Sequence, residues 1–318
     1  MNPFSETNNV SELDEKSLIK RVCVAFDEVM PSSPYGAGDD CAVVPQVPSD
    51  TLATVDSVIM DRHFTRNTPP ELAAQKLINR NVSDIASMGG TPLYALTSAV
   101  FSGNLSLDWL DRFSRGLADA AKKYGIKLVG GDMARVGGEF FSMHLTLIGK
   151  SPQTPLLRMG AKVGDAIYIT GPLGISFDSE HHLNFSPRLE EGKWLASISG
   201  VSACTDVSDG VASDLKNILP RECYAEINKD ALPLRAFNGR VATVNEALCD
   251  GEDYELLFCF DGDCAIFEAE YFAKFAKQLF RIGTIKKANS SEEENAIVLV
   301  SSDSRNIFRE SGFSHTAS

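Results

Sequence analysis

Aspartates recur along this chain at points where an apolar run gives way to Gly, Ser or a turn. Carboxylates at the ends of strands and helices are typical ligands of hard cations, and such cations often neutralise phosphate groups. Any one of these aspartates could equally be a turn residue, a helix cap or a solvated surface charge. Their repetition constrains the fold more strongly than any single motif, because we expect the ends of these strands and helices to meet around one pocket that holds cations. The aspartates are Asp39, Asp40, Asp56, Asp84, Asp132, Asp206 and Asp209.

Composition limits the kinds of partner. The chain has 318 residues, of which 43% are hydrophobic, so it is long enough for two domains with buried cores. Its formal net charge of −13 argues against a nucleic-acid surface, which would need a basic stripe, and against adsorption to anionic membranes. A phosphate-bearing substrate would therefore bind through metal ions or at local Lys and Arg side chains. Solubility alone would explain the acidity equally well.

Cysteine usage and the N-terminal sequence indicate the compartment. The seven cysteines form no C-x-x-C pair, which argues against zinc sites and a disulfide framework and fits a reducing compartment. The first residues, MNPFSETNNVSELDEK, lack the basic and apolar regions of a signal peptide, and no apolar run approaches the length of a membrane span. We therefore expect a cytoplasmic protein.

Strands and helices alternate in both halves, which predicts an α/β or α+β fold. A Gly-containing connection over residues 158–165 separates the halves, and we expect an N-terminal domain over 1–150 and a C-terminal domain over 151–318. Three local expectations matter for the site: a strand ends near Asp56, a short strand runs into Gly130-Gly131-Asp132, and Ser208 caps a helix. Strands are predicted over 52–59, 93–101, 127–129, 140–148, 166–170, 201–205, 254–260 and 297–300, and helices over 69–88, 107–124, 189–198, 208–219 and 265–279.

Individual segments remain ambiguous when each is taken alone. Asp84 shares a helical face with Asn81 and Met88, where a buried carboxylate is costly unless it is paired or bound to a metal. His63 could donate to a phosphate or be an ordinary polar residue. The acidic run (Asp250–Glu255) is expected to be solvated charge. The sequence contains no G-x-x-x-x-G-K-[ST] loop, no protein-kinase motif set and no G-x-S-x-G elbow, so the common phosphate-binding and hydrolase motifs are excluded.

Taken in order, the segments resemble the thiamine-monophosphate kinase family. The resemblance is carried by GDDCAVV, VDSVIMDRHF, NRNVSDIASMGG, LVGGDMAR, RMGAKVGDAIYITGPLG, TDVSDGVASDL and DGEDYELLF, and it spans about residues 15 to 315. It implies a two-domain aminoimidazole-ribonucleotide-synthetase-like fold. In such a fold the N-terminal domain has a mixed sheet, binds ATP and magnesium and forms a homodimer, and the C-terminal α/β domain closes the active site. It also implies transfer of the ATP γ-phosphoryl group to thiamine monophosphate.

The resemblance also implies a set of site residues. Because the acceptor is an anionic phosphate oxygen, no general base is expected, and several Mg²⁺ ions neutralise charge while the groups are held in line. Val55 lacks a side-chain oxygen and could contribute only its backbone carbonyl. The implied magnesium ligands are Asp40, Thr54, Val55, Asp56, Asp84, Asp132, Asp206 and Asp209. The implied ATP contacts are Gly131, Asp132, Arg158 and Ser208, and the implied thiamine monophosphate contacts are His63, Glu252 and Phe313.

The chain departs from the family pattern in three places. Met133 and Ala134 replace two hydroxyl residues, Cys249 and Asp250 precede Gly251-Glu252-Asp253 where the family has Ser-Gly, and the stretch after Gly174 is short, so that a helix expected before Phe185 is missing. Two alternatives stay open on these grounds. The chain could be a same-fold enzyme that uses ATP on another small molecule, or a non-catalytic paralogue that binds nucleotide.

Overall fold

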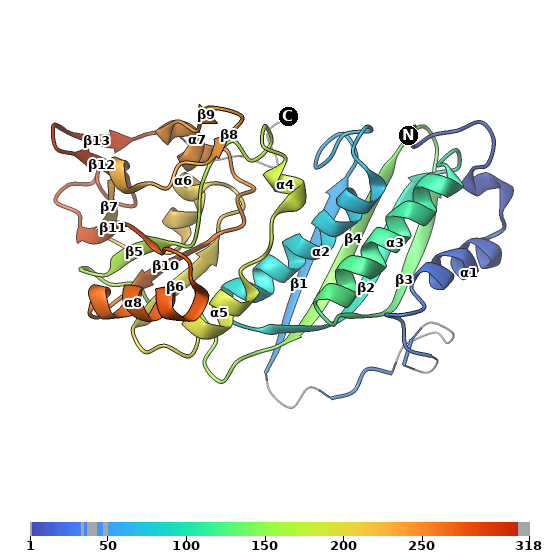
Figure 1. Ribbon diagram of the computed structural model, residues 1–318, viewed down its shortest axis with the longest axis horizontal. Coiled ribbons are helices and arrows are strands. Elements are labelled where there is room, and N and C mark those ends of the chain that lie inside the picture. Colours follow the sequence, from blue (N-terminus) through green and yellow to red (C-terminus); the bar gives the residue numbers. More distant parts are fainter. Residues whose placement is uncertain (1, 33–34, 37–42, 47–49, 311–318) are drawn as a thin grey trace. The chain divides into compact units, whose positions relative to one another are not determined.

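The computed structural model describes residues 2–32, 35–36, 43–46 and 50–310. The chain divides into two compact units, which are described separately (Figure 1). The first, called the N-terminal unit, comprises Met1–Ile85 and Thr91–Ser151. The second, called the C-terminal unit, comprises Ala86–Gly90 and Pro152–Ser318.

A four-stranded mixed sheet forms the centre of the N-terminal unit. Its order is β1-β4-β2-β3; β4 is antiparallel to both neighbours, and β3 is parallel to β2. The helices α2 and α3 cover one face of the sheet, and α1 lies beside α3 (Figure 1). The bounds are β1 Thr51–Ile59, β2 Thr91–Ser102, β3 Lys127–Val136 and β4 Phe141–Lys150, with η1 Val10–Glu12, α1 Glu15–Ala25, α2 Pro70–Ser87 and α3 Leu107–Lys123.

The helix α3 joins its sheet through an aromatic core. The Ser106 side chain caps its first turn by accepting the Trp109 amide. The Trp109 ring lies 5.3 Å from that of Phe113 and 4.7 Å from that of Phe141 on β4, and all three residues are buried. Such aromatic pairs bury large apolar areas, so this cluster fixes α3 against the sheet.

The strand register shows which residues lie on each face of this sheet, and the two faces differ in exposure. Val55, Thr146 and Leu96 are direct cross-strand neighbours, so they lie on one face. On that face Val55 is 63% exposed and Leu96 is 44% exposed. Asp56 belongs to the opposite face, where its carboxylate meets Arg80 of α2. Alternation along β1 therefore points Asp56 toward the helices and Val55 away from them.

A seven-stranded sheet forms the centre of the C-terminal unit, in the order β13-β12-β7-β11-β5-β10-β6. Residues of β10 alternate between two apolar clusters: Leu257 and Cys259 belong to one, and Leu256 and Phe258 to the other. The sheet is thus covered on both faces. The strands are β5 Ala166–Ile169, β6 Val201–Asp206, β7 Cys223–Asn228, β10 Leu256–Phe260, β11 Phe280–Lys287, β12 Ile297–Ser301 and β13 Ser304–Phe308, and β8 Ala236–Phe237 and β9 Arg240–Val241 form a separate pair. The helices are α4 His181–Asn184, α5 Leu189–Leu195, α6 Val211–Asp214, η2 Leu215–Asn217, η3 Lys229–Ala231, α7 Val244–Cys249 and α8 Cys264–Phe275.

Two local predictions about element ends were wrong, whereas the strand predicted over 52–59 is confirmed as β1. The strand β3 continues through Gly130-Gly131-Asp132 to Val136, because β2 supplies backbone partners along its length. The first helix after Asp206 begins at Val211 with Gly210 as its N-cap, not with Ser208, whose amide donates to the Asp214 side chain. A helix of one turn, α4, precedes Phe185.

None of the helices within the described ranges combines the length and the apolar character that crossing a membrane requires.

Replacing Trp109 by Ala should cost about 3–5 kcal/mol of the free energy of unfolding, because it empties the centre of the aromatic core. Urea unfolding followed by far-UV circular dichroism measures the loss. The control is Val24→Ala on α1, where the side chain is 69% exposed and a change within about 0.5 kcal/mol is expected. Equal losses in the two variants would contradict the core described here.

Candidate functional site

Two polar pairs connect β1 with α2 in the N-terminal unit. The Thr54 hydroxyl donates to the Asp84 carboxylate, and Arg80 Nη2 lies 3.0 Å from Asp56 Oδ1. Thr54 and Asp56 are two apart on a strand, whereas Arg80 and Asp84 are four apart on a helix, so each pair projects from one face of its element. The Arg80 guanidinium also donates to the Ser57 carbonyl at 2.6 Å. The geometry thus brings together three of the predicted metal ligands, Thr54, Asp56 and Asp84.

His63 is held in one orientation directly after β1. The Ile59 amide donates to His63 Nδ1 at 3.0 Å, so a neutral ring carries its proton on Nε2. The Lys76 ammonium, which is fully buried, donates to the His63 carbonyl at 2.7 Å. These contacts fix the orientation of the ring, and the contact of His63 with a phosphate stays a prediction.

Gly131 and Asp132 lie beside an apolar cavity of about 120 Å³. Its walls come from α1, β2, β3 and α3, and they include Cys23, Thr97 and Ser114. A Cβ at Gly131 would lie 2.3 Å from the Thr97 carbonyl oxygen, so only glycine fits there. Ser114 is 1% exposed, and its Oγ has no hydrogen-bond partner. An unsatisfied hydroxyl in the wall of a cavity is a candidate contact for a ligand.

A carboxylate-rich turn follows β6 in the C-terminal unit. Asp206 is 3% exposed at the end of the strand. The amides of Ser208 and Asp209 donate to Asp214 Oδ2 at 3.0 and 2.9 Å. Burial, and then the negative charge of Asp206, raise the pKa of Asp214 to about 8. Like charges are therefore crowded around this turn, and a bound cation would relieve the repulsion.

These donor sets fit Mg²⁺, which prefers oxygen ligands and usually takes only one or two carboxylates from a protein. Within the part of the chain that the structure describes, no group of three or more His, Cys, Asp or Glu side chains could hold an ion by itself. Among the described carboxylates, Asp56 and Asp84 lie along the contact between β1 and α2, and Asp206, Asp209 and Asp214 lie around the turn after β6.

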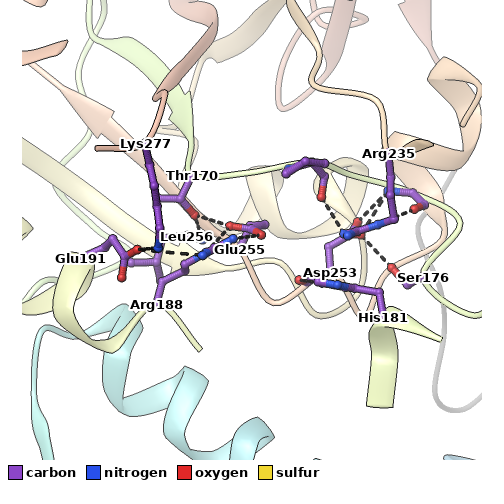
Figure 2. Close-up of polar contacts among 12 residues, drawn as sticks. Thr170, Ser176, His181, Arg188, Glu191, Arg235, Asp253, Glu255, Leu256 and Lys277 are labelled. Carbon is purple, nitrogen blue, oxygen red and sulfur yellow. Dashed lines mark hydrogen bonds and ion pairs between the residues drawn. The ribbon is translucent and has the colours of Figure 1, made fainter. Parts of the chain in front are cut away.

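The acidic run is buried, so the expectation of solvated charge was wrong. Glu252 is 2% exposed, and Asp253 and Glu255 are each 1% exposed. Figure 2 shows Asp253 between Arg235, Ser176 and His181. Burial raises the pKa of Asp253 to about 6, although Arg235 opposes the shift. The protein compensates these charges with arginine and hydrogen-bond donors, as burial demands.

Glu255 forms the second half of the network in Figure 2. Its carboxylate accepts Nε and Nη2 of Arg188 at 2.6 and 2.5 Å and the Thr170 hydroxyl at 2.7 Å. Glu191 accepts from Lys277 at 2.7 Å nearby. A Cβ at Gly171 would lie 2.5 Å from a Glu255 carboxylate oxygen, which explains the glycine after Thr170.

The remaining predicted site residues fall in three classes. Arg158 is exposed in a loop, and the Val55 side chain points away from Asp56, so Val55 has only its carbonyl to offer. Asp40 and Phe313 lie outside the described residues. Sequence reasoning missed Ser114, which carries no local signal, and Arg188. It noted Asp214 in the TDVSDGVASD motif but assigned it no role.

Comparisons with known proteins identify relatives of this chain. Residues 38–151 match the family described as AIR synthase related protein, N-terminal domain. The chain is 34% identical over 272 residues to the thiamine-monophosphate kinase of Haemophilus influenzae, which covers 77% of this chain and 81% of that protein.

Solved structures extend the likeness to the fold. The crystal structure of thiamine-monophosphate kinase from Stenotrophomonas maltophilia K279a matches with a TM-score of 0.73 and 27% identity over 87% of this chain and 95% of that one. A structure described as AaThiL complexed with AMPPCP and TMP matches with a TM-score of 0.67 and 25% identity over 93% of this chain and 96% of that one. The predicted α/β fold class and its family likeness are confirmed.

Protonation of His181 should weaken the fold. Its Nε2 donates to the Asp253 carbonyl at 2.9 Å, and burial, aided by Arg235, lowers its pKa to about 4. Between pH 6.5 and 4 the unfolded chain binds more protons than the folded one, so stability falls as the pH falls. Relative to His181→Gln, the wild-type free energy of unfolding should drop by roughly 3 kcal/mol across this window. Urea titrations at several pH values measure it, and parallel pH curves for the two proteins would contradict the assignment.

Proposed function

This chain belongs to the thiamine-monophosphate kinase family, and we propose that it transfers the γ-phosphoryl group of ATP to thiamine monophosphate, giving thiamine diphosphate and ADP. The observation that carries the proposal is the grouping of carboxylates at two places: Asp56 and Asp84 with Thr54 between β1 and α2, and Asp206 and Asp209 beside Asp214.

The acceptor chemistry explains why carboxylates dominate. The attacking group is a phosphate oxygen that is already anionic, so no side chain has to remove a proton. Bound Mg²⁺ would supply the positive charge that offsets the phosphate oxygens of both substrates. Asp40, Asp56, Asp84, Asp132, Asp206 and Asp209 would hold the ions, with Thr54 and the Val55 carbonyl as neutral oxygen ligands.

The apolar cavity would take the purine base of ATP. It lies next to Gly131, where the backbone can approach the nucleotide because no side chain intervenes. Aromatic bases favour apolar walls that also offer a few fixed polar groups, and Ser114 is such a group. Arg158 and the Ser208 hydroxyl would contact the ATP phosphates. His63, Glu252 and Phe313 would contact thiamine monophosphate.

The open face of the N-terminal sheet supports a homodimer. Val55 on β1 and Leu96 on β2 are exposed apolar residues on this face, on either side of Thr146 of β4, and a partner subunit would cover them. On this proposal residues 1–150 bind ATP and magnesium and form the dimer, residues 151–318 complete the enzyme, and the protein acts in the cytoplasm.

Asp56→Asn should abolish at least about 99% of thiamine diphosphate formation, because it removes one unit of the charge that holds Mg²⁺. Product analysis by anion-exchange chromatography after incubation with ATP, Mg²⁺ and thiamine monophosphate measures it. Free thiamine, which lacks the acceptor phosphate, should not be consumed by the wild type. Unchanged turnover in Asp56→Asn would remove the metal assignment. ADP formed only with another acceptor would favour a same-fold enzyme with a different substrate.

Ser114→Ala should raise KM for ATP about five- to tenfold, the value of one hydrogen bond, and leave KM for thiamine monophosphate unchanged. The free protein should be no less stable, because the lost hydroxyl has no partner in it. The matched control is Ser102→Ala, whose buried hydroxyl bonds both backbone groups of Phe140 and whose loss should affect stability alone. An unchanged KM for ATP in Ser114→Ala would exclude this cavity as the base site.

A further inference from the structure

The acidic run holds a neighbouring loop, residues 170–176, through three of its four carboxylates. Four residues of the loop, one at its start and three at its end, donate to these acids. The donors are Thr170 Oγ1 to Glu255 at 2.7 Å, the Gly174 amide to Asp253 at 3.1 Å, Ser176 Oγ to Asp253 at 2.7 Å, and the Ile175 amide to Asp250 at 2.8 Å.

Asp253 is the most constrained of these acids. Arg235 Nη2 lies 2.9 Å from its Oδ1, and the same guanidinium donates to the carbonyls of Pro172 at 2.6 Å and Gly174 at 3.0 Å. The Asp253 side chain has no exposed area, and that of Arg235 is 12% exposed. Figure 2 shows this group at the centre of its polar contacts. A buried charge that is paired and saturated with hydrogen bonds fixes the backbone that carries it.

The backbone on both sides of Asp253 is strained. Glu252 has φ 54° and Tyr254 has φ 51°, both in the left-handed region, and Gly251 before them has φ 70°. Non-glycine residues are strained in this region, and such strain is typical of functional sites. The Glu252 amide donates to the Ser208 carbonyl and the Tyr254 amide to the Val207 carbonyl, each at 2.8 Å. Asp253 thus anchors the middle of a strained turn.

We propose that Asp253 is a positioning residue for the phosphate acceptor: with Arg235 it holds Glu252 in the left-handed conformation that presents the Glu252 carboxylate to thiamine monophosphate. The inference rests on the proposed function, in which Glu252 contacts that substrate. The neighbouring Ser208–Asp209 turn has its own anchor, Asp214, which accepts both of its amides. The two turns thus have different side-chain anchors, although the Glu252 amide joins their backbones at the Ser208 carbonyl. We therefore expect each substrate to respond mainly to the loss of its own anchor.

The test is a comparison of three Asp→Asn variants in the full-length protein, with kcat, both KM values and thermal stability measured for each. Asp253→Asn should raise KM for thiamine monophosphate about tenfold while KM for ATP stays within about twofold. Asp214→Asn should do the reverse. The control is Asp165→Asn, another carboxylate that is 2% exposed and holds a different loop through Lys162 and Ser202; it should lower stability and change neither KM.

The KM values of these variants decide whether Asp253 is a positioning residue. An unchanged KM for thiamine monophosphate in Asp253→Asn, or equal rises for both substrates, would overturn the positioning role. If Asp253→Asn does not fold, Arg235→Lys carries the test, because one ammonium cannot reproduce the contacts to Asp253, Pro172 and Gly174 together. Its KM for thiamine monophosphate should rise in the same selective way, and an unchanged value would overturn the role. A wild-type protein that forms no thiamine diphosphate would remove the proposed function itself.

Discussion

The cost of removing carboxylates from water governs the C-terminal unit. Asp206, Asp214, Glu252, Asp253 and Glu255 are all nearly inaccessible to solvent. An ionised carboxylate in such surroundings needs a cation or several hydrogen-bond donors. Arg188 compensates Glu255 and Arg235 compensates Asp253, and each arginine thereby fixes a loop. The buried acids thus form two groups. Asp253 and Glu255 bind arginines and hold loops, whereas Asp206 lies at a turn that would bind a metal ion.

In the N-terminal unit, side chains of β1 point alternately to the two faces of the sheet, so the adjacent residues Val55 and Asp56 have different environments. Asp56 faces α2 and meets Arg80, whereas Val55 faces the open side of the sheet. One strand can therefore carry part of a metal site on one face and an association surface on the other. A shift of register by one residue would exchange these faces, so the antiparallel pairing with β4 also fixes where the predicted ligands point.

Sequence reasoning predicted most of the strands and helices here, because long periodic segments such as α2 and α3 depend on local pattern. It failed where partners distant in sequence decide the outcome. Gly130-Gly131-Asp132 has the composition of a turn, yet pairing with β2 extends the strand through it. Asp250–Glu255 has the composition of a solvated surface, yet it is buried because Arg188 and Arg235, which are distant in sequence, compensate two of its carboxylates. Ser114 carries no motif, so only the cavity beside it reveals a potential contact.

The division of the acids into those that hold cations and those that hold loops can be tested by counting Mn²⁺ ions. Electron paramagnetic resonance would measure the ions bound in the presence of ATP by wild type, Asp206→Asn and Asp253→Asn. The account predicts that Asp206→Asn loses at least about one bound ion relative to wild type and that Asp253→Asn keeps the full number. A full number in Asp206→Asn, or a loss in Asp253→Asn, would contradict it.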